Sequence, residues 1–153
     1  MRPQKEFTVR ECGRIEWQKF RRYHYLNEDI PSACRCFGLY DGETIVGFMG
    51  VLHQPHGINK KLKRVSRLVI LPDYQGIGLG VKFLNFVGGI YKAQGYDFTI
   101  VTSARNMIFA LRKSGKWIMT RWSNIKCNRP RSLIDCNRKT IRVMVKTAAF
   151  VMR

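Results

Sequence analysis

The sequence of 153 residues predicts an α/β fold in one domain, residues 1–153, and three patterns carry that prediction. A short apolar run, Leu68–Leu71, passes through Pro72 and a glycine-rich loop into an amphipathic stretch of helical type. Before it, two apolar runs flank an Asp41-Gly42 turn signal typical of a β-hairpin. After it, strand-type and helix-type patterns alternate. The length allows one sizeable hydrophobic core.

The first half of the chain is expected to supply a helix and three strands. The helix is predicted around Arg14–Arg22, where basic and aromatic residues interleave. For Trp17 and Phe20, three residues apart, we expect burial in the core. The strands are predicted over residues 36–41, 44–52 and 64–71, with the Asp-Gly turn between the first two.

The second half alternates helices and strands. A helix is expected over residues 81–94, because apolar residues recur at positions 83, 84, 87, 90 and 91, and Gly95 fits a helix stop. The remaining expected elements are a strand over 97–102, a short helix over 106–113 with Ser103 or Asn106 as N-cap, and late strands over 117–122 and 141–146.

The loop between the third strand and the long helix has the chemistry of an anion site. Backbone N–H groups of such a loop and the positive end of the helix dipole favour a phosphate, and glycine allows close approach of the backbone. The glycines run G-x-G-x-G, which departs from the G-x-G-x-x-G of dinucleotide loops, and no G-x-x-x-x-G-K-[ST] is present. A tight turn whose glycines serve only packing is the structural alternative.

The segment Gln75–Gly80 fits the pattern Q/R-x-x-G-x-G/A and resembles the coenzyme-A loop of the GNAT acyltransferase superfamily. The order of elements and the Ser114–Trp117 step are also similar to that superfamily. The resemblance implies a mixed central sheet with helices on both faces, and an acyl-CoA donor such as acetyl-CoA. The alternative donor is an aminoacyl-tRNA, because a strongly basic surface could also bind a tRNA. The donor-binding residues implied are Leu68, Val69, Gln75, Gly76, Ile77, Gly78, Leu79, Gly80 and Asn106.

The chain carries a net charge of +18, from 28 Lys and Arg against 10 Asp and Glu. Lys and Arg side chains that cluster with few acidic neighbours repel one another unless a polyanion neutralises their charge. The composition therefore favours a nucleic-acid partner. A small cofactor on a generally basic surface and a membrane surface are the alternatives. The candidate nucleic-acid contacts are Arg21, Arg22, Tyr23, Tyr25, Lys60, Lys61, Lys63, Arg64, Arg67, Arg121, Lys126, Arg129 and Arg131.

Four residues are candidates for the catalytic chemistry: Asp73, His24, Tyr74 and Ser103. Asp73 is the only carboxylate between Thr44 and Tyr96 and lies beside the glycine loop. A carboxylate or a histidine can take the proton that an acceptor amine loses, and the sequence leaves open which of Asp73 and His24 does so. A turn aspartate and a structural histidine are the alternatives for these two residues.

A closer resemblance rests on Tyr23–Leu26, Leu71–Gly78 and Thr102–Ala104. These motifs are similar to those of the Mom-type DNA modification proteins of bacteriophages. The resemblance implies transfer of an acetamido or acyl-type group to adenine N6 in double-stranded DNA, as protection against restriction. It also places Tyr23 and Tyr74 at the base pocket. Two other classes stay open: an acetyl-CoA-dependent N-acetyltransferase acting on RNA, protein or a small amine, and a non-catalytic nucleic-acid-binding protein.

The five cysteines are odd in number and irregularly spaced, so we expect reduced thiols and no metal site. A metal site or a redox thiol is the alternative. No apolar run approaches the length of a membrane span, and the first residues lack the apolar core of a signal peptide. The sequence therefore predicts a cytoplasmic protein, in the host cytoplasm if a phage encodes it, with no membrane partner and with tRNA as a further candidate partner.

Overall fold

The computed structural model describes residues 5–24, 29–124 and 146–153, and the contacts of the chain group into two compact units. The first unit runs to Ile100 and includes Met152; the second runs from Val101 to Val151 and includes Arg153. The prediction of one domain over residues 1–153 stays a prediction. None of the described helices is both long and apolar enough to cross a membrane.

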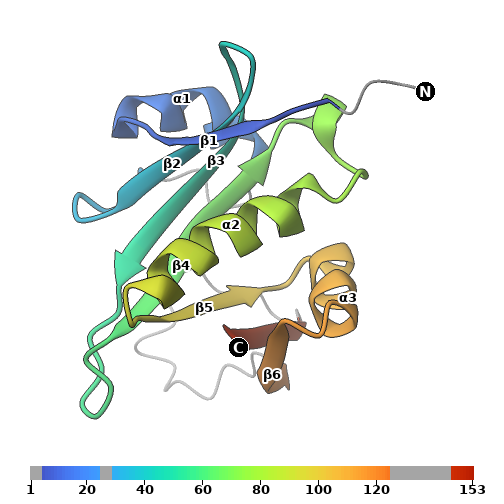
Figure 1. Ribbon diagram of the computed structural model, residues 1–153. Coiled ribbons are helices and arrows are strands. Elements are labelled where there is room, and N and C mark those ends of the chain that lie inside the picture. The colour runs from blue at the N-terminus through green and yellow to red at the C-terminus, as the bar shows by residue number, and fades with distance from the viewer. Residues whose placement is uncertain (1–4, 25–28, 125–145) are drawn as a thin grey trace, which may run out of the picture. The chain divides into compact units, whose positions relative to one another are not determined.

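The first unit is built on a mixed sheet (Figure 1). Its strands are hydrogen-bonded in the order β1-β2-β3-β4-β5, with antiparallel pairing from β1 to β4 and parallel pairing of β4 with β5. Their bounds are β1 Thr8–Glu11, β2 Arg35–Asp41, β3 Thr44–His53, β4 Leu62–Ile70 and β5 Asp97–Thr102. The Asp-Gly hairpin turn is confirmed, with Gly42 at a φ of 60°.

One face of this sheet is covered by a short helical segment. It consists of the 3-10 helix η1 Arg14–Glu16, the helix α1 Trp17–Phe20 and the 3-10 helix η2 Arg21–Tyr23. Trp17 and Phe20 are 1% and 0% exposed, as predicted, and both rings pack against Phe48 of β3. The core cluster on this face also contains Cys34, Cys36 and Val69. Burial of these apolar side chains fixes the helical segment on the sheet.

The opposite face is covered by α2 Leu79–Ala93, which Figure 1 shows lying across the strands. Tyr91 of α2 stacks on Phe98 of β5 and meets Phe37 of β2 edge-on. Gly88 allows the helix to approach closely, because a β-carbon there would lie 2.7 Å from the Phe98 ring. A mixed sheet with helices on both faces is thus the fold of this unit, as expected.

The second unit contains the helix α3 Arg105–Lys113, the strand β6 Trp117–Asn124 and most of the strand β7 Lys146–Met152. The last residue of β7, Met152, belongs to the first unit. β7 is the hydrogen-bonded neighbour of β6 in the sheet order. The Arg153 N–H donates to the Lys116 carbonyl at 2.9 Å. Ile108 and Leu111 of α3, together with Trp117 and Phe150, are buried in this unit.

Several predicted elements need correction. The strand β1 was not predicted, because an edge strand with one apolar residue in four has no alternating pattern. The first helix is a single turn of α-helix between two 3-10 helices. The N-cap of α3 is Ala104, so the expectation of Ser103 or Asn106 is wrong; the Ala104 N–H donates to Thr102 Oγ1 at 3.1 Å. The late strand expected over residues 141–146 lies, except for Lys146, outside the described residues.

Candidate active site

The glycine loop leaves the end of β4 and is held by three hydrogen bonds. The Leu71 N–H donates to Val46 O at 2.9 Å, and the Tyr74 N–H donates back to Leu71 O at 2.9 Å. The side chain of Gln75 donates from Nε2 to Ile70 O at 2.7 Å. The 3-10 helix η3 Pro72–Tyr74 and the extended Gln75 then lead into the loop. These hydrogen bonds fix the segment that leads from β4 into the glycines.

Two glycines shape the open side of the loop. Gly76 and Gly78 have φ values of 82° and 79°, in the left-handed region that favours glycine. A β-carbon placed on either would meet no heavy atom within 4 Å. The backbone is thus open at the point where α2 begins, where N–H groups of the first turn lack helical partners. This cradle fits the pyrophosphate of coenzyme A.

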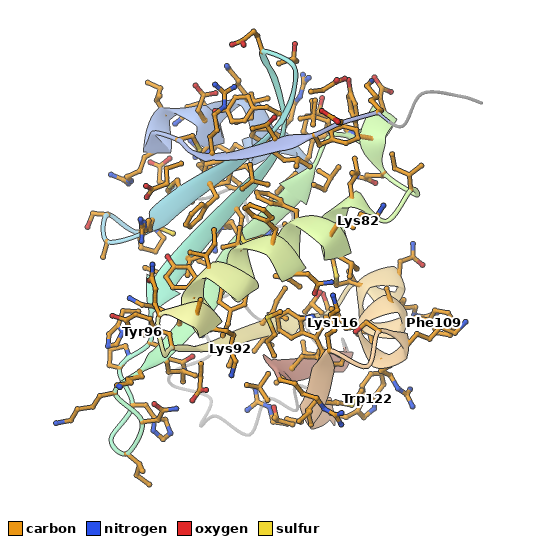
Figure 2. All side chains as sticks on the ribbon, viewed as in Figure 1. Lys82, Lys92, Tyr96, Phe109, Lys116 and Trp122 are labelled. Carbon is orange, nitrogen blue, oxygen red and sulfur yellow. The ribbon has the colours of Figure 1, made fainter. Side chains whose placement is uncertain are left out.

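The first turn of α2 favours an anion further. It contains no acidic residue, and Gly78 supplies no side-chain cap that would occupy the N–H groups. Lys82 lies on this turn beside the loop (Figure 2), and its side chain is exposed. Its backbone N–H donates to Gly78 O at 3.2 Å. The ammonium of Lys82, which the sequence reasoning missed, adds positive charge at the same helix end.

β4 is bulged at Ser66. Gly50 of β3 pairs with Arg67, and the next residue, Val51, pairs with Val65, so Ser66 is the extra residue on β4. The parallel ladder with β5 covers only Leu62–Arg64 of β4. Beyond Arg64, β4 therefore has an edge that makes no ladder with β5 among the described residues. The bulge position depends on register between strands, so no local sequence pattern could have located it.

Arg67 follows the bulge and lies on the face covered by α1. Its guanidinium carbon is 5.9 Å from the centroid of the Trp17 ring, and its Nη1 donates to Ser66 O at 2.9 Å. Its Nε is buried and has no hydrogen-bond partner within the described chain. Arg67, predicted as a nucleic-acid contact, is thus half-buried beside Trp17, with one side-chain donor that is unsatisfied among the described residues.

His24 lies on the same face as Arg67. Its ring meets that of Trp17 edge-on, with centroids 5.7 Å apart, and its backbone N–H donates to Arg21 O. Trp17 therefore contacts both His24 and the guanidinium of Arg67. Beside His24, the hydroxyl of Tyr23 accepts a hydrogen bond from Arg22 Nη2 at 2.5 Å, and Arg21 pairs with Asp29. Tyr25 lies outside the described residues.

Tyr74 and Asp73 of η3 differ in their contacts. The Tyr74 hydroxyl donates to Asp41 Oδ2 at 2.7 Å, and Lys5 pairs with the same carboxylate. The hydrogen bond to Asp41 raises the pKa of Tyr74, and the bond from Lys5 lowers the pKa of Asp41. Tyr74 thus ties the loop to the β2–β3 turn, while Asp73 is exposed beside the glycine loop.

The other predicted donor-site residues divide by burial. Val69 is 5% exposed and packs in the α1-side core, whereas Leu68 is half-buried. Ile77 is 61% exposed in the loop, and Leu79 is buried at the start of α2. Gly80 follows Leu79 in the first turn. Ser103 and Asn106 belong to the second unit. Ser103 is half-buried and precedes α3, whereas Asn106 is exposed in the first turn of α3.

The predicted basic contacts lie on several elements. Lys60, Lys61, Lys63 and Arg64 are on the β3–β4 hairpin, and Arg121 is exposed on β6. Lys126, Arg129 and Arg131 lie outside the described residues.

Of the cysteines that the structure describes, Cys12, Cys34 and Cys36 are free thiols. Burial raises the pKa of Cys12 to about 12, which makes this thiol unreactive. No cluster of metal-ligating side chains occurs within the described residues.

The comparisons with known proteins agree with this arrangement. Residues 4–109, which include the helical segment, β4 and the glycine loop, match the acetyltransferase (GNAT) family. No curated protein matches the chain.

Solved structures of similar fold cover almost the whole chain. A GNAT acetyltransferase from Elizabethkingia anophelis, solved with acetyl-CoA bound, is 14% identical with a TM-score of 0.66, covering 98% of this chain and 99% of that one. The ribosomal-protein-S18-alanine N-acetyltransferase from Escherichia coli is 13% identical with a TM-score of 0.65, covering 96% and 93%. An IAA acetyltransferase from Bacillus cereus is 12% identical with a TM-score of 0.65, covering 96% and 99%. At these identities the structures support the fold, and the sequence match over residues 4–109 shows that the chain belongs to the acetyltransferase (GNAT) family.

Proposed function

We propose that the protein is an acyl-CoA-dependent transferase whose acceptor is adenine N6 in double-stranded DNA. The observation that carries the donor half is the open, positive-φ backbone at Gly76 and Gly78, at the N-terminus of α2. The net charge of +18 supports the acceptor half, since a nucleic acid supplies the neutralising charge. The resemblance to Mom-type proteins supports adenine as the target base.

The donor is held by backbone rather than by a dedicated side chain. The N–H groups of the loop and of the first turn of α2 would bind the pyrophosphate, with Lys82 alongside. The pantetheine arm could hydrogen-bond the edge of β4 beyond Arg64, where the ladder with β5 ends. Acyl-CoA, when bound, supplies a thioester carbonyl that an amine can attack.

The bulge on β4 would stabilise the charge that develops on the carbonyl oxygen. A bulged residue is left out of the strand ladder, so a backbone N–H at Ser66 can turn toward a ligand. Arg67 adds a buried Nε–H that donates to no partner within the described residues. Donors of this kind, preorganised in a site that excludes water, typically contribute about 3 to 4 kcal/mol to transition-state stabilisation.

His24 is the better placed of the two candidate bases. Trp17 contacts both its ring and the guanidinium of Arg67, the residue after the bulge, whereas Asp73 is exposed on the donor side of the loop. In the proposed step the adenine N6 attacks the acyl carbon, a C–N bond forms and the C–S bond breaks. His24 would take the N6 proton and return it to the departing thiolate, which leaves as the coenzyme-A thiol.

The experiment follows release of the coenzyme-A thiol with a colorimetric disulfide reagent, using acetyl-CoA and the full chain. Duplex DNA containing adenine is compared with a duplex of inosine and cytosine, which lacks the N6 amino group. Thiol release that requires adenine supports the proposal. Equal release with both duplexes, or none with either while a small amine is acetylated, would remove DNA adenine as the acceptor.

An N-acetyltransferase of ordinary amines is the second candidate. It is favoured by the Escherichia coli relative of 13% identity, which is named as an N-acetyltransferase of a ribosomal-protein alanine. A free amine becomes nucleophilic once it loses a proton, whereas adenine N6 has a delocalised lone pair. Thiol release with spermidine or an N-terminal peptide, unaffected by added DNA, would favour this candidate.

A further inference from the structure

The connection between β3 and β4 carries the most exposed large apolar side chain that the structure describes. Ile58 is 92% exposed, more than Ile15 at 78% or Ile77 at 61%. The loop that carries it, residues 54–61, extends beyond the ends of both strands (Figure 1). A single exposed apolar residue is ordinary on a protein surface, so what matters is how this one is held and what surrounds it.

The loop around Ile58 is ordered by its own polar groups. His56 Nδ1 accepts hydrogen bonds from the backbone N–H groups of Ile58 and Asn59, at 3.2 and 3.0 Å. The Asn59 side chain accepts from the Lys61 N–H at 2.9 Å and donates to Asp97 at 2.7 Å. The side chain of Ile58 therefore lies on an ordered loop, and binding of this side chain to a partner requires little further loss of backbone entropy.

The same hairpin is strongly basic. Lys60, Lys61, Lys63 and Arg64 follow Ile58, and the segment from His53 to Arg64 contains no acidic residue. Lys63 Nζ lies 4.7 Å from the ring centroid of Tyr96, which Figure 2 shows beside this end of the sheet. A positive rim around one apolar tip matches the groove of a duplex, whose phosphates flank stacked bases.

We propose that Ile58 is a wedge that enters double-stranded DNA and unstacks a base step. This inference rests on the proposed function, because an adenine inside a duplex must leave the stack before its N6 can react. Proteins that kink DNA insert isoleucine, leucine or phenylalanine between base steps in this way. Basic residues of the hairpin hold the phosphates, and the side chain of Ile58 replaces the lost stacking contact.

The position of the hairpin along β4 agrees with this role. The tip precedes Leu62, the first residue of β4, and the bulge at Ser66 lies four residues further along the same strand. A duplex that lies along β4 would therefore meet both the hairpin and the bulge.

The test measures binding of the full chain to a duplex with 2-aminopurine at one adenine position, whose fluorescence rises when the base unstacks. Ile58→Ala is compared with Ile118→Ala, which removes an isoleucine that is 43% exposed on β6. We expect Ile58→Ala to weaken duplex binding about tenfold and to abolish the fluorescence rise, with single-strand affinity changed less than about twofold. Ile118→Ala should match the unmodified protein.

A second variant separates a wedge from a phosphate contact. The double change Lys60→Gln and Lys61→Gln should lower the slope of affinity against salt by about two, whereas Ile58→Ala should leave that slope unchanged.

Three results would overturn the inference, and they differ from one another. If the protein binds duplex DNA and Ile58→Ala binds and unstacks it equally well, the wedge is wrong while the DNA acceptor stands. If the unmodified protein binds no duplex, the DNA acceptor falls and the wedge with it. If Ile58→Ala instead abolishes binding to phosphatidylserine vesicles and leaves DNA binding intact, the tip is a membrane contact.

Discussion

At the scale of single residues, the groups proposed to act on the substrate are distinct from the groups that hold the loop. His24 and Arg67 both contact Trp17, a fully buried ring, so the positions of both depend on the packing of α1 against β3. Tyr74 has its hydroxyl engaged by Asp41 and serves the structure of the loop. Residues of one sequence motif, Asp73 and Tyr74, thus have different surroundings.

The assignment of the base is tested by changing each candidate to an amide of similar size. His24→Gln should lower kcat by about 100-fold or more, the usual contribution of a positioned base, with little change in KM for acetyl-CoA. Asp73→Asn should lower kcat by less than about threefold, because its carboxylate is exposed to solvent. Steady-state kinetics and the pH profile of kcat/KM measure both. A large loss in Asp73→Asn with an active His24→Gln would reverse the assignment.

The donor loop is tested with two glycines in the same backbone conformation. Gly78 and Gly95 have φ values of 79° and 85°, and a β-carbon on either meets no heavy atom within 4 Å. Gly78→Ala and Gly95→Ala should therefore each cost about 1 kcal/mol of stability through backbone strain. Only Gly78→Ala should weaken acetyl-CoA binding, by about tenfold or more, as measured by calorimetry. Equal affinity in the two variants would show that the loop does not hold the donor.

At the scale of elements, most of the fold could be predicted and the site could be predicted only in part. The helix expected over 81–94 is α2, and the strand expected over 97–102 is β5, because both have strong local periodicity. The bulge at Ser66 and the bond between Tyr74 and Asp41 could not be predicted, since each joins residues far apart in the chain. Local patterns contain no information on register or on side-chain partners across strands.

The packing of α2 on the sheet is tested by two adjacent glycines. A β-carbon on Gly88 would lie 2.7 Å from the buried Phe98 ring, whereas one on Gly89 would meet nothing within 4 Å. Gly88→Ala should destabilise the protein by about 1 to 3 kcal/mol through overpacking. Gly89→Ala should stabilise it by up to about 1 kcal/mol, because alanine favours the helix. Urea denaturation measures both; equal effects would mean that the helix does not approach the sheet at Gly88.

The link between the loop and the β2–β3 turn should depend on pH. The pKa of Asp41 lies below its ordinary value of 3.8, because the carboxylate is bonded to Lys5 and Tyr74. Its contribution to stability is therefore present above about pH 4 and lost as the pH falls through the lowered pKa. The melting temperature of Tyr74→Phe should lie below that of the unmodified protein at pH 7, and the two should converge once the pH falls below the lowered pKa of Asp41. A constant difference would show that Asp41 does not mediate the link.

At the scale of the whole molecule, the family and the net charge underlie the two halves of the proposed reaction. The match to the GNAT family supports an acyl-CoA donor, and the net charge of +18 attracts a polyanion. Sequence composition alone predicted the second property, while the first needed the loop motif and the match over residues 4–109.

The most direct measurement is nucleoside mass spectrometry of plasmid DNA from cells that express the protein, beside cells that express Gly78→Glu. The glutamate would place a negative side chain where the donor pyrophosphate binds. The account predicts a heavier deoxyadenosine in the first sample that is absent from the second. Unmodified deoxyadenosine in both samples, with the protein folded and soluble, would contradict the account and leave an N-acetyltransferase of other amines as its function.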